Sequence, residues 1–371
     1  MNARRIAVEV DEKGRISARV VGENAYSPTL PLPLSSADLD RQLIGLFERW
    51  QQERGRRWIQ AEIRTFGALL HRALFPPDLW NWICTAAQGY QLVRLTLTFP
   101  GTFPHARLAS IPWEFLYRPD KQYEQGWFLA GRSGVTLSRY IPSRAGIPEL
   151  DFIRHPRLLA IVSQPKAERR VDADEVLAGI HRAAVDCGLE VEIVYSPGAA
   201  ELREIITAWQ PHIVQFMGHG RFDADRGEGR LAFAAPHGET AWIPDSGVVD
   251  LLVTPEWTPR AVVLHACEGG TTDYEAGFAG VAPQLCRASV HCVVAMQYPV
   301  TNETATNFST RFYHELAQRQ PPDVAVQAAR AHIATTDNSV RLIGVPVVYL
   351  HSDAPLLPGP EQEGRNEALP V

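Results

Sequence analysis

The stretch that decides the fold is Ile213-Val-Gln-Phe-Met-Gly-His-Gly220, together with Ala261-Val-Val-Leu-His-Ala-Cys-Glu-Gly-Gly270. In each, a run of apolar residues ends in a histidine or a cysteine that is followed at once or one residue later by glycine. Short apolar runs of this kind are typical of strands that are buried on both faces of a parallel sheet. Functional side chains in such sheets lie just beyond the carboxyl ends of the strands. The residues that follow Met217 and Ala266 are therefore the first candidates for catalytic or binding side chains.

The surrounding sequence alternates apolar strands with amphipathic helices from residue 157 to residue 350. The expected strands are 158–162, 191–194, 213–217, 261–266, 291–296 and 345–350, and the expected helices are 172–187, one opened by Pro197-Gly198, 276–289, 303–319 and 324–334. This alternation predicts an α/β fold with a mainly parallel sheet that is flanked by helices.

Three segments are expected along the chain. Residues 1–150 form an N-terminal α/β region, with a hairpin over 6–20, a helix over 59–74 and a strand over 91–99. An aromatic-rich stretch, 111–142, connects this region to the second segment, 151–355, which carries the two strand ends. Residues 356–371 are rich in proline and glycine near their start and have no period, and we expect a disordered tail there.

Composition excludes several classes of protein. The 371 residues are 45% hydrophobic and 21% charged, with a net charge of −6, so an acidic surface without a basic run argues against nucleic acid as a direct partner. No secretory signal and no apolar run of membrane-spanning length is found, and no membrane association is expected. Five cysteines at irregular spacing do not form a disulfide framework. Together these features predict a protein of the reducing cytoplasm.

The two strand ends supply the groups that cysteine chemistry needs. A thiol attacks well only as a thiolate, so the candidate nucleophile Cys267 needs a nearby base, and His219 ends a strand of the same sheet. Neighbouring strands lie about 4.8 Å apart, which brings the two residues within reach of each other. Gly220 permits close approach of a substrate to the backbone, and the amides of Gly220 and Cys267 are the candidate oxyanion hole.

The spacing of these residues supports the same interpretation. His219 precedes Cys267 by 48 residues, and caspase-type proteases place their histidine about 50 residues before the cysteine. Motifs of serine hydrolases and zinc proteases are missing from the sequence. Cys286, His291 and Cys292 do not have the usual spacing of metal ligands, so core packing is predicted for them and no metal is expected.

Several further motifs resemble one family, the CHAT proteases of the caspase, separase and gingipain clan of cysteine peptidases. The segments that carry this resemblance are Ile111-Pro-Trp-Glu-Phe-Leu-Tyr117, Phe128-Leu129, Ser138-Arg-Tyr140, Gly218-His-Gly220, Leu264-His-Ala-Cys-Glu268, Tyr298-Pro-Val300, Phe312-Tyr-His-Glu-Leu316 and Ala325-Val-Gln-Ala-Ala-Arg330. They occur in the family's order over about residues 90–350. The resemblance implies a caspase-like fold and a cysteine endopeptidase with a Cys-His dyad, which needs no cofactor.

The sequence departs from the family pattern at three points. It has none of the tetratricopeptide repeats that many relatives carry, which implies a separate activator or sensor protein. Gln297 stands where an aromatic residue is common, and we expect it only to repack a strand end. His265 lies two residues before Cys267, where relatives have an aspartate or glutamine that sets specificity. We therefore assign His265 to the substrate-binding pocket, and the P1 preference stays open.

By this resemblance the substrate is a partner protein, cleaved in a bacterial defence or regulated cell-death pathway. Two alternatives remain: a catalytically silent scaffold that binds protein, and a hydrolase of small esters or amides. The stretches 221–230 and 268–277 are expected to be exposed loops, in which any self-cleavage would fall. Trp113 and Glu114 are expected to be a buried structural pair.

Overall fold

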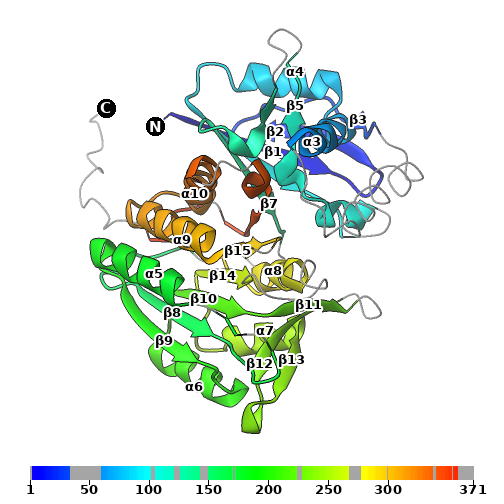
Figure 1. The fold of residues 1–371 in the computed structure, drawn as a ribbon. Helices are drawn as coiled ribbons and strands as arrows, with labels where there is room; N and C mark the ends of the chain where they lie inside the picture. Colours follow the sequence, from blue (N-terminus) through cyan, green and yellow to red (C-terminus); the bar gives the residue numbers. More distant parts are fainter. Residues whose placement is uncertain are drawn as a thin grey trace, which may run out of the picture.

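One sheet of eleven strands runs through the part of the chain that the structure describes (Figure 1). The computed structural model describes residues 2–33, 60–101, 105–120, 126–142, 149–168, 170–171, 173–223, 228–266, 277–298, 300–336, 340–352 and 354–357. In order across the sheet the strands are β3 (Leu30–Pro31), β2 (Arg15–Val20), β1 (Ala3–Val10), β4 (Leu92–Thr98), β7 (Val135–Tyr140), β16 (Pro346–Leu350), β15 (Cys292–Met296), β14 (Ala261–Ala266), β10 (Ile213–Gly218), β8 (Arg157–Val162) and β9 (Glu190–Tyr195).

Nine of the eleven strands form two parallel groups, and β2 and β3 continue the sheet beyond β1 in antiparallel pairs. Strands β1, β4, β7 and β16 are parallel to one another, and β15, β14, β10, β8 and β9 form the second parallel group. The two groups join where β16 pairs antiparallel with β15. Because of this reversal, the N-terminal ends of β7 and β16 lie on the same side of the sheet as the C-terminal ends of β10, β14 and β15.

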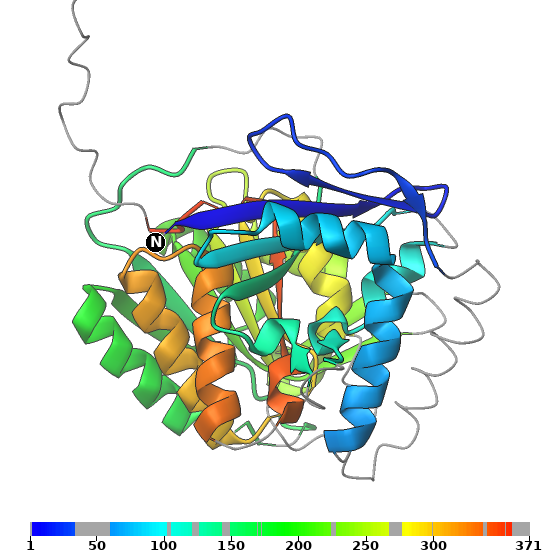
Figure 2. The same cartoon turned by 90° about the horizontal axis from the view of Figure 1, so that it is seen from above.

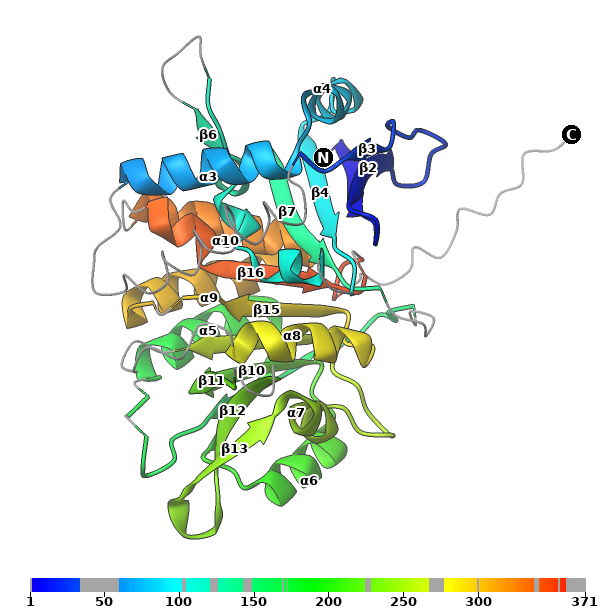
Figure 3. The same cartoon turned by 90° about the vertical axis from the view of Figure 1, so that its right-hand side faces the viewer.

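Helices cover both faces of the sheet. Their bounds are α3 (Gln60–Leu74), α4 (Pro77–Ala86), α5 (Asp174–Cys187), α6 (Ala199–Trp209), α7 (Asp245–Leu252), α8 (Gly277–Arg287), α9 (Asn302–Ala317) and α10 (Pro322–Thr336). Helices α5, α9 and α10 lie on one face, while α6, α7 and α8 lie on the other (Figures 1 and 3). The predicted α/β fold, a mainly parallel sheet flanked by helices, is confirmed.

Shorter elements complete the fold. They are the three-stranded sheet β11 (Gly220–Asp223), β12 (Glu228–Ala234) and β13 (Thr240–Pro244), the pair β5 (Tyr117–Arg118) and β6 (Trp127–Phe128), and the 3-10 helices η2 (His105–Ser110), η3 (Trp113–Phe115), η4 (Leu129–Gly131), η5 (Pro236–Gly238) and η6 (Val340–Gly344).

Local sequence explains where the central elements begin and end. Every residue of β10 is buried, as an apolar run between two helical layers requires. Helix α5 ends at Gly188, whose left-handed backbone (φ 61°) closes the last turn at little cost. Helix α9 begins after Thr301, whose Oγ1 accepts a hydrogen bond of 3.1 Å from the amide of Thr304.

The N-terminal strands extend the same sheet across the predicted boundary at residue 150. Seen from above, β1 and the neighbouring strands continue the sheet and α3 and α4 lie beside them (Figure 2). The segment 111–142 is predicted as a connection, but it is not only that. It contains β7, which lies in the interior of the sheet between β4 and β16. The division of the chain at residue 150 stays a prediction.

Of the predicted tail 356–371, the structure describes only Leu356 and Leu357. Both are buried, and the carbonyl of Leu356 accepts a hydrogen bond from Arg260. The disordered tail stays a prediction. Residues 358–371 lie outside the described part of the chain. The predicted loop 221–230 is largely the paired strands β11 and β12, because their ladder satisfies the backbone groups. Of the predicted loop 268–277, only Gly277 is described, as the first residue of α8.

A buried ion pair fastens the N-terminal strands to α10. Asp323, in the first turn of α10, accepts two hydrogen bonds from Arg94 of β4, at 2.6 and 2.8 Å, and one from Thr136 of β7 at 2.7 Å. Asp323 is 2% exposed, so its charge depends on these three donors. The contacts join parts of the chain that are more than 180 residues apart.

Candidate active site

The ends of β10 and β14 bring together the two strand ends that the sequence singled out. The two strands are parallel neighbours, and their register pairs Gly218 with Ala266. His219 follows Gly218 directly and is 2% exposed. Cys267 is the next residue after Ala266 in the chain, and it lies outside the described residues. The structure thus places His219 and Ala266, the residue that precedes Cys267, side by side at the C-terminal ends of adjacent strands.

The backbone around His219 is held from two sides. Its carbonyl accepts a hydrogen bond of 2.9 Å from the amide of Ala232 in β12. Ser163, after β8, donates its hydroxyl to the carbonyl of Ala232 and its amide to the carbonyl of Met217. A Cβ on Gly218 would lie 2.7 Å from the ring of Phe216. This packing fixes the point at which the chain leaves β10.

The amide of Gly220 points away from the strand that pairs with it. In an antiparallel ladder, opposite residues alternate between pairs that exchange hydrogen bonds and pairs that do not. The bond from Ala232 to His219 makes those two residues a bonded pair, so Gly220 and its neighbour Leu231 form a pair without bonds. The N–H of Gly220 is therefore directed away from β12.

His265 lies on β14, one residue before the strand ends, and is fully buried. Its neighbour Leu264 belongs to the apolar cluster on the side of α6 to α8, so the imidazole points to the opposite face, toward α5, α9 and α10. Both ring nitrogens lack a hydrogen-bond partner. The role of His265 in substrate binding stays a prediction, and it requires the ring to become accessible.

Burial lowers the pKa of His265 to about 4. An unfolded chain protonates this imidazole at about pH 6.5, whereas the folded chain keeps it neutral down to about pH 4. The stability that the neutral ring contributes is present above pH 6.5 and is lost as the pH falls toward 4. We expect His265→Leu to reduce the drop in unfolding free energy between about pH 7 and pH 5 by roughly 2 kcal/mol. Urea denaturation at both pH values measures this.

The control for that substitution is His181→Leu, on the exposed side of α5. His71 and His212, whose pKa values burial also lowers to about 4, keep part of the pH dependence in every variant. An unchanged pH dependence in His265→Leu would contradict a buried, neutral His265.

A buried polar network links the end of β15 to β7, η3 and η6. Arg139 of β7 donates two hydrogen bonds to the carboxylate of Glu114, at 3.1 and 2.6 Å. Gln297, the first residue after β15, donates to the same carboxylate at 2.9 Å and to the carbonyl of Gly344 at 3.0 Å. The expectation that Gln297 only repacks a strand end is therefore incomplete, since it links the N-terminal strands to the edge that carries His219.

Trp113 and Glu114 are both buried, as expected of a structural pair. Their side chains form hydrogen bonds with different partners, however. The indole of Trp113 donates to the carbonyl of Leu108 at 2.7 Å, while Glu114 bonds Arg139. Glu114 and Arg139, from two of the motifs that carry the family resemblance, thus meet Gln297, a departure from the family pattern, in one network.

Cys286 and Cys292 lie in the hydrophobic core, as predicted. Burial raises the pKa of both thiols, so they stay protonated. His291 is buried at the start of β15.

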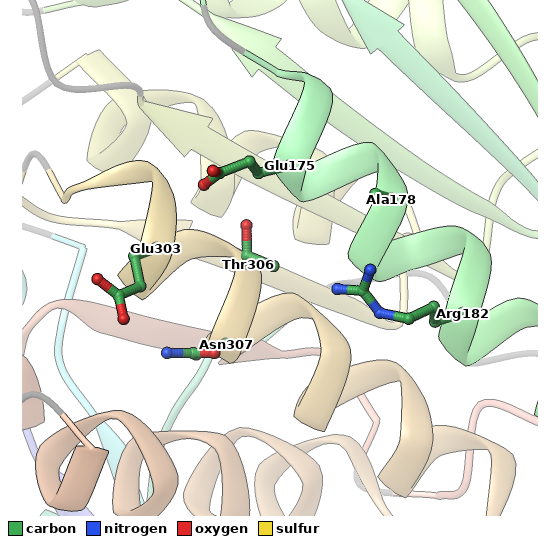
Figure 4. Close-up of a pocket in the computed structure, with 6 residues that line it drawn as sticks. All are labelled: Glu175, Ala178, Arg182, Glu303, Thr306 and Asn307. Atoms are coloured by element: carbon green, nitrogen blue, oxygen red, sulfur yellow. The ribbon is translucent and has the colours of Figure 1, made fainter.

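A polar groove of about 280 Å³ lies between α5 and α9 (Figure 4). Its lining residues are Glu175, Ala178, Arg182, Glu303, Thr306 and Asn307. Glu175 and Arg182 are exposed, whereas Val176 and Ile180 of the same helix are buried toward the sheet. The groove therefore lies on the solvent side of the helix pair, and His265 does not line it. None of the described helices is long and apolar enough to span a membrane.

Among solved structures, the chain resembles separase of Saccharomyces cerevisiae in its complex with securin, with a TM-score of 0.46 and 10% identity over 94% of this chain and 30% of the separase chain. It also resembles RgpB of Porphyromonas gingivalis (TM-score 0.43, 10% identity, 81% of this chain and 70% of that one). A third is the Drosophila initiator caspase Dronc (TM-score 0.39, 10% identity, 60% and 88%).

A search of curated proteins finds no match. A sequence model of the CHAT domain matches residues 64–356. The match takes in β4 to β16, including both strand ends and the network around Glu114. It covers well over half of the sequence, and the chain therefore belongs to the CHAT domain family.

Proposed function

We propose that this protein is a caspase-like cysteine endopeptidase in which Cys267 is the nucleophile and His219 is the base. The observation that carries the proposal is the register of β10 and β14, which pairs Gly218 with Ala266. His219 directly follows Gly218 in the chain, and Cys267 directly follows Ala266. Each proposed catalytic residue is therefore about 3.8 Å, from Cα to Cα, from a member of this pair. Membership of the CHAT family supports the same assignment.

The proposed reaction uses only groups of this chain, the substrate and water. His219 takes the thiol proton, and the Cys267 thiolate forms a bond to the scissile carbonyl carbon. The amides of Gly220 and Cys267 donate to the resulting oxyanion, a role that the outward N–H of Gly220 supports. The C–N bond then breaks, and protonated His219 gives its proton to the leaving amine. Water, activated by His219, hydrolyses the thioester and restores the thiol.

The proposed substrate is a partner protein, cleaved in a bacterial defence or regulated cell-death pathway in the cytoplasm. A separate activator or sensor protein would control the cleavage. These assignments rest on the family, and no metal or organic cofactor takes part in the proposed reaction.

The test is incubation of the purified protein and of its Cys267→Ala variant with a P1-diverse peptide library, read by mass spectrometry. We expect sequence-dependent cleavage by the parent alone, which would also give the P1 residue. Cleavage of small esters without peptide cleavage would favour the small-substrate hydrolase. No cleavage and no labelling of Cys267 by a thiol-reactive peptide would favour a scaffold that binds protein.

A further inference from the structure

A second cavity lies in the N-terminal half of the molecule, between α4, the β5–β6 pair and the starts of β4 and β7. We call it the Trp80–Trp127 cavity, after the two indole rings in its wall. Its volume is about 470 Å³, within the range of sites for small organic ligands. Side chains of β4 and β7, among them Val93, Leu95 and Val135, provide apolar surface in its lining.

The two indoles are close neighbours in this wall. The ring centroids of Trp80 and Trp127 are 6.2 Å apart, with 47° between the planes. Trp80 is 7% exposed, and its buried indole N–H has no hydrogen-bond partner. Aromatic surface of this extent favours flat, apolar ligand bodies.

Two arginines add positive charge to this surface. The guanidinium of Arg118 lies over the ring of Trp80 at 5.0 Å, and that of Arg132 lies over the ring of Trp127 at 4.5 Å. The lining contains no aspartate or glutamate. Among the described residues, neither guanidinium has a carboxylate within salt-bridge distance, so the positive charge of the cavity is not neutralised there.

The histidine beside this cavity, His71, is neutral at neutral pH. Burial, together with the charge of Arg118, lowers the pKa of the neighbouring His71 to about 4. The His71 ring packs against Trp80, with 4.7 Å between centroids. Because His71 stays neutral, the net charge at this end of the cavity is that of Arg118.

A guanidinium that lies over an aromatic ring still has N–H groups to donate to a ligand. Those donors match the two oxygens of a carboxylate or a phosphate. The cavity thus combines aromatic walls with two cations that have no carboxylate partner in the described part of the chain. We propose that it binds a small organic anion, a flat ring that carries one phosphate or carboxylate group. This site lies on other residues than the candidate active site, and the proposal does not rest on peptidase activity.

Cys84 gives the test a local reporter, because it lines the same cavity and is exposed. The protein is prepared as the Cys267→Ala variant, so that the candidate nucleophile does not react. N-ethylmaleimide then alkylates Cys84, and mass spectrometry of its peptide follows the rate. The probes are adenosine 5′-monophosphate and indole-3-acetate, each a ring with an anion, compared with adenosine and with inorganic phosphate. Isothermal titration gives the affinities directly.

We expect at least one ring-bearing anion to bind with a Kd below about 1 mM and to slow the alkylation of Cys84. Adenosine and inorganic phosphate should each bind about tenfold more weakly. A preference between the two anions shows which combination of ring and charged group the cavity takes. Arg132→Met, at an exposed position, and Arg118→Met should each weaken binding by about tenfold or more. Arg203→Met, on the exposed side of α6, should leave it unchanged.

Either of two results would overturn the proposal. One is that neither ring-bearing anion binds the parent, and the other is that the arginine variants bind as tightly as the parent. Circular dichroism establishes that each variant is folded, and the single substitution at Arg132 keeps the test available if Arg118→Met unfolds the protein.

Discussion

We expect His219→Ala to lower kcat/KM for peptide cleavage by about 10³-fold or more. In the proposed mechanism, loss of the imidazole leaves the thiol of Cys267 without its base and the leaving amine without its proton donor. The thiolate fraction at neutral pH then depends on the ordinary pKa of a cysteine. The measurement is steady-state cleavage of a peptide chosen from the library, at several pH values.

The control for this prediction is His212→Ala, a buried histidine at the opposite end of β10. Its Nδ1 accepts a hydrogen bond from the amide of Arg157, so its loss should lower stability more than turnover by the folded protein. If His219→Ala were folded and kept more than about a tenth of the parent activity, the assignment of His219 as the base would be wrong.

Glu114→Ala costs about 3–5 kcal/mol of unfolding free energy. The carboxylate is 0% exposed, and Arg139, which it bonds through both oxygens, is 3% exposed. Burial lowers the pKa of Arg139, but the charge of Glu114 outweighs it, and the pKa stands above its ordinary value. Truncating Glu114 leaves this cation buried without its counter-charge and takes an acceptor from Gln297. Urea denaturation measures the loss.

Glu23→Ala is the matched control, because Glu23 also pairs with an arginine, Arg4, but is half exposed. Surface pairs of this kind contribute at most about 1 kcal/mol. If Glu114→Ala does not fold, Glu114→Gln, which keeps the size and one acceptor, should fold with a smaller loss. A loss no larger than that of Glu23→Ala would refute the account of the network.

The sequence pattern predicted the second half of the fold because most of its strands are apolar runs. Strands such as β10 and β14 are buried between two helical layers, so their own sequence shows the burial. The two strand ends could be found in the same way, since a polar residue after such a run has few structural uses. The pairing of Gly218 with Ala266 then follows from the parallel sheet.

The interior position of β7 could not be predicted by that argument. Thr136, Ser138 and Arg139 make the strand look half-polar, yet all three are buried. Arg139 pairs with Glu114, Ser138 donates to Thr96, and Thr136 donates to Asp323, which lies almost 190 residues away in the sequence. Pairings over such distances leave no periodic signal in the sequence. Glu114 and Arg139 lie in two of the family motifs and Gln297 departs from the family pattern, and nothing in the sequence indicated that the three side chains meet.

The position of β16 in the sheet determines when the sheet can be completed during synthesis. It is the last described strand in the chain, and it lies between β7 and β15. Until residues 346–350 have left the ribosome, the sheet exists as two halves, whose edge strands β7 and β15 offer unpaired backbone groups. Pairing of the final strand over such a sequence distance is intrinsically slow. A nascent chain therefore stays divided between its two halves until one short segment, made after all the other described strands, unites them.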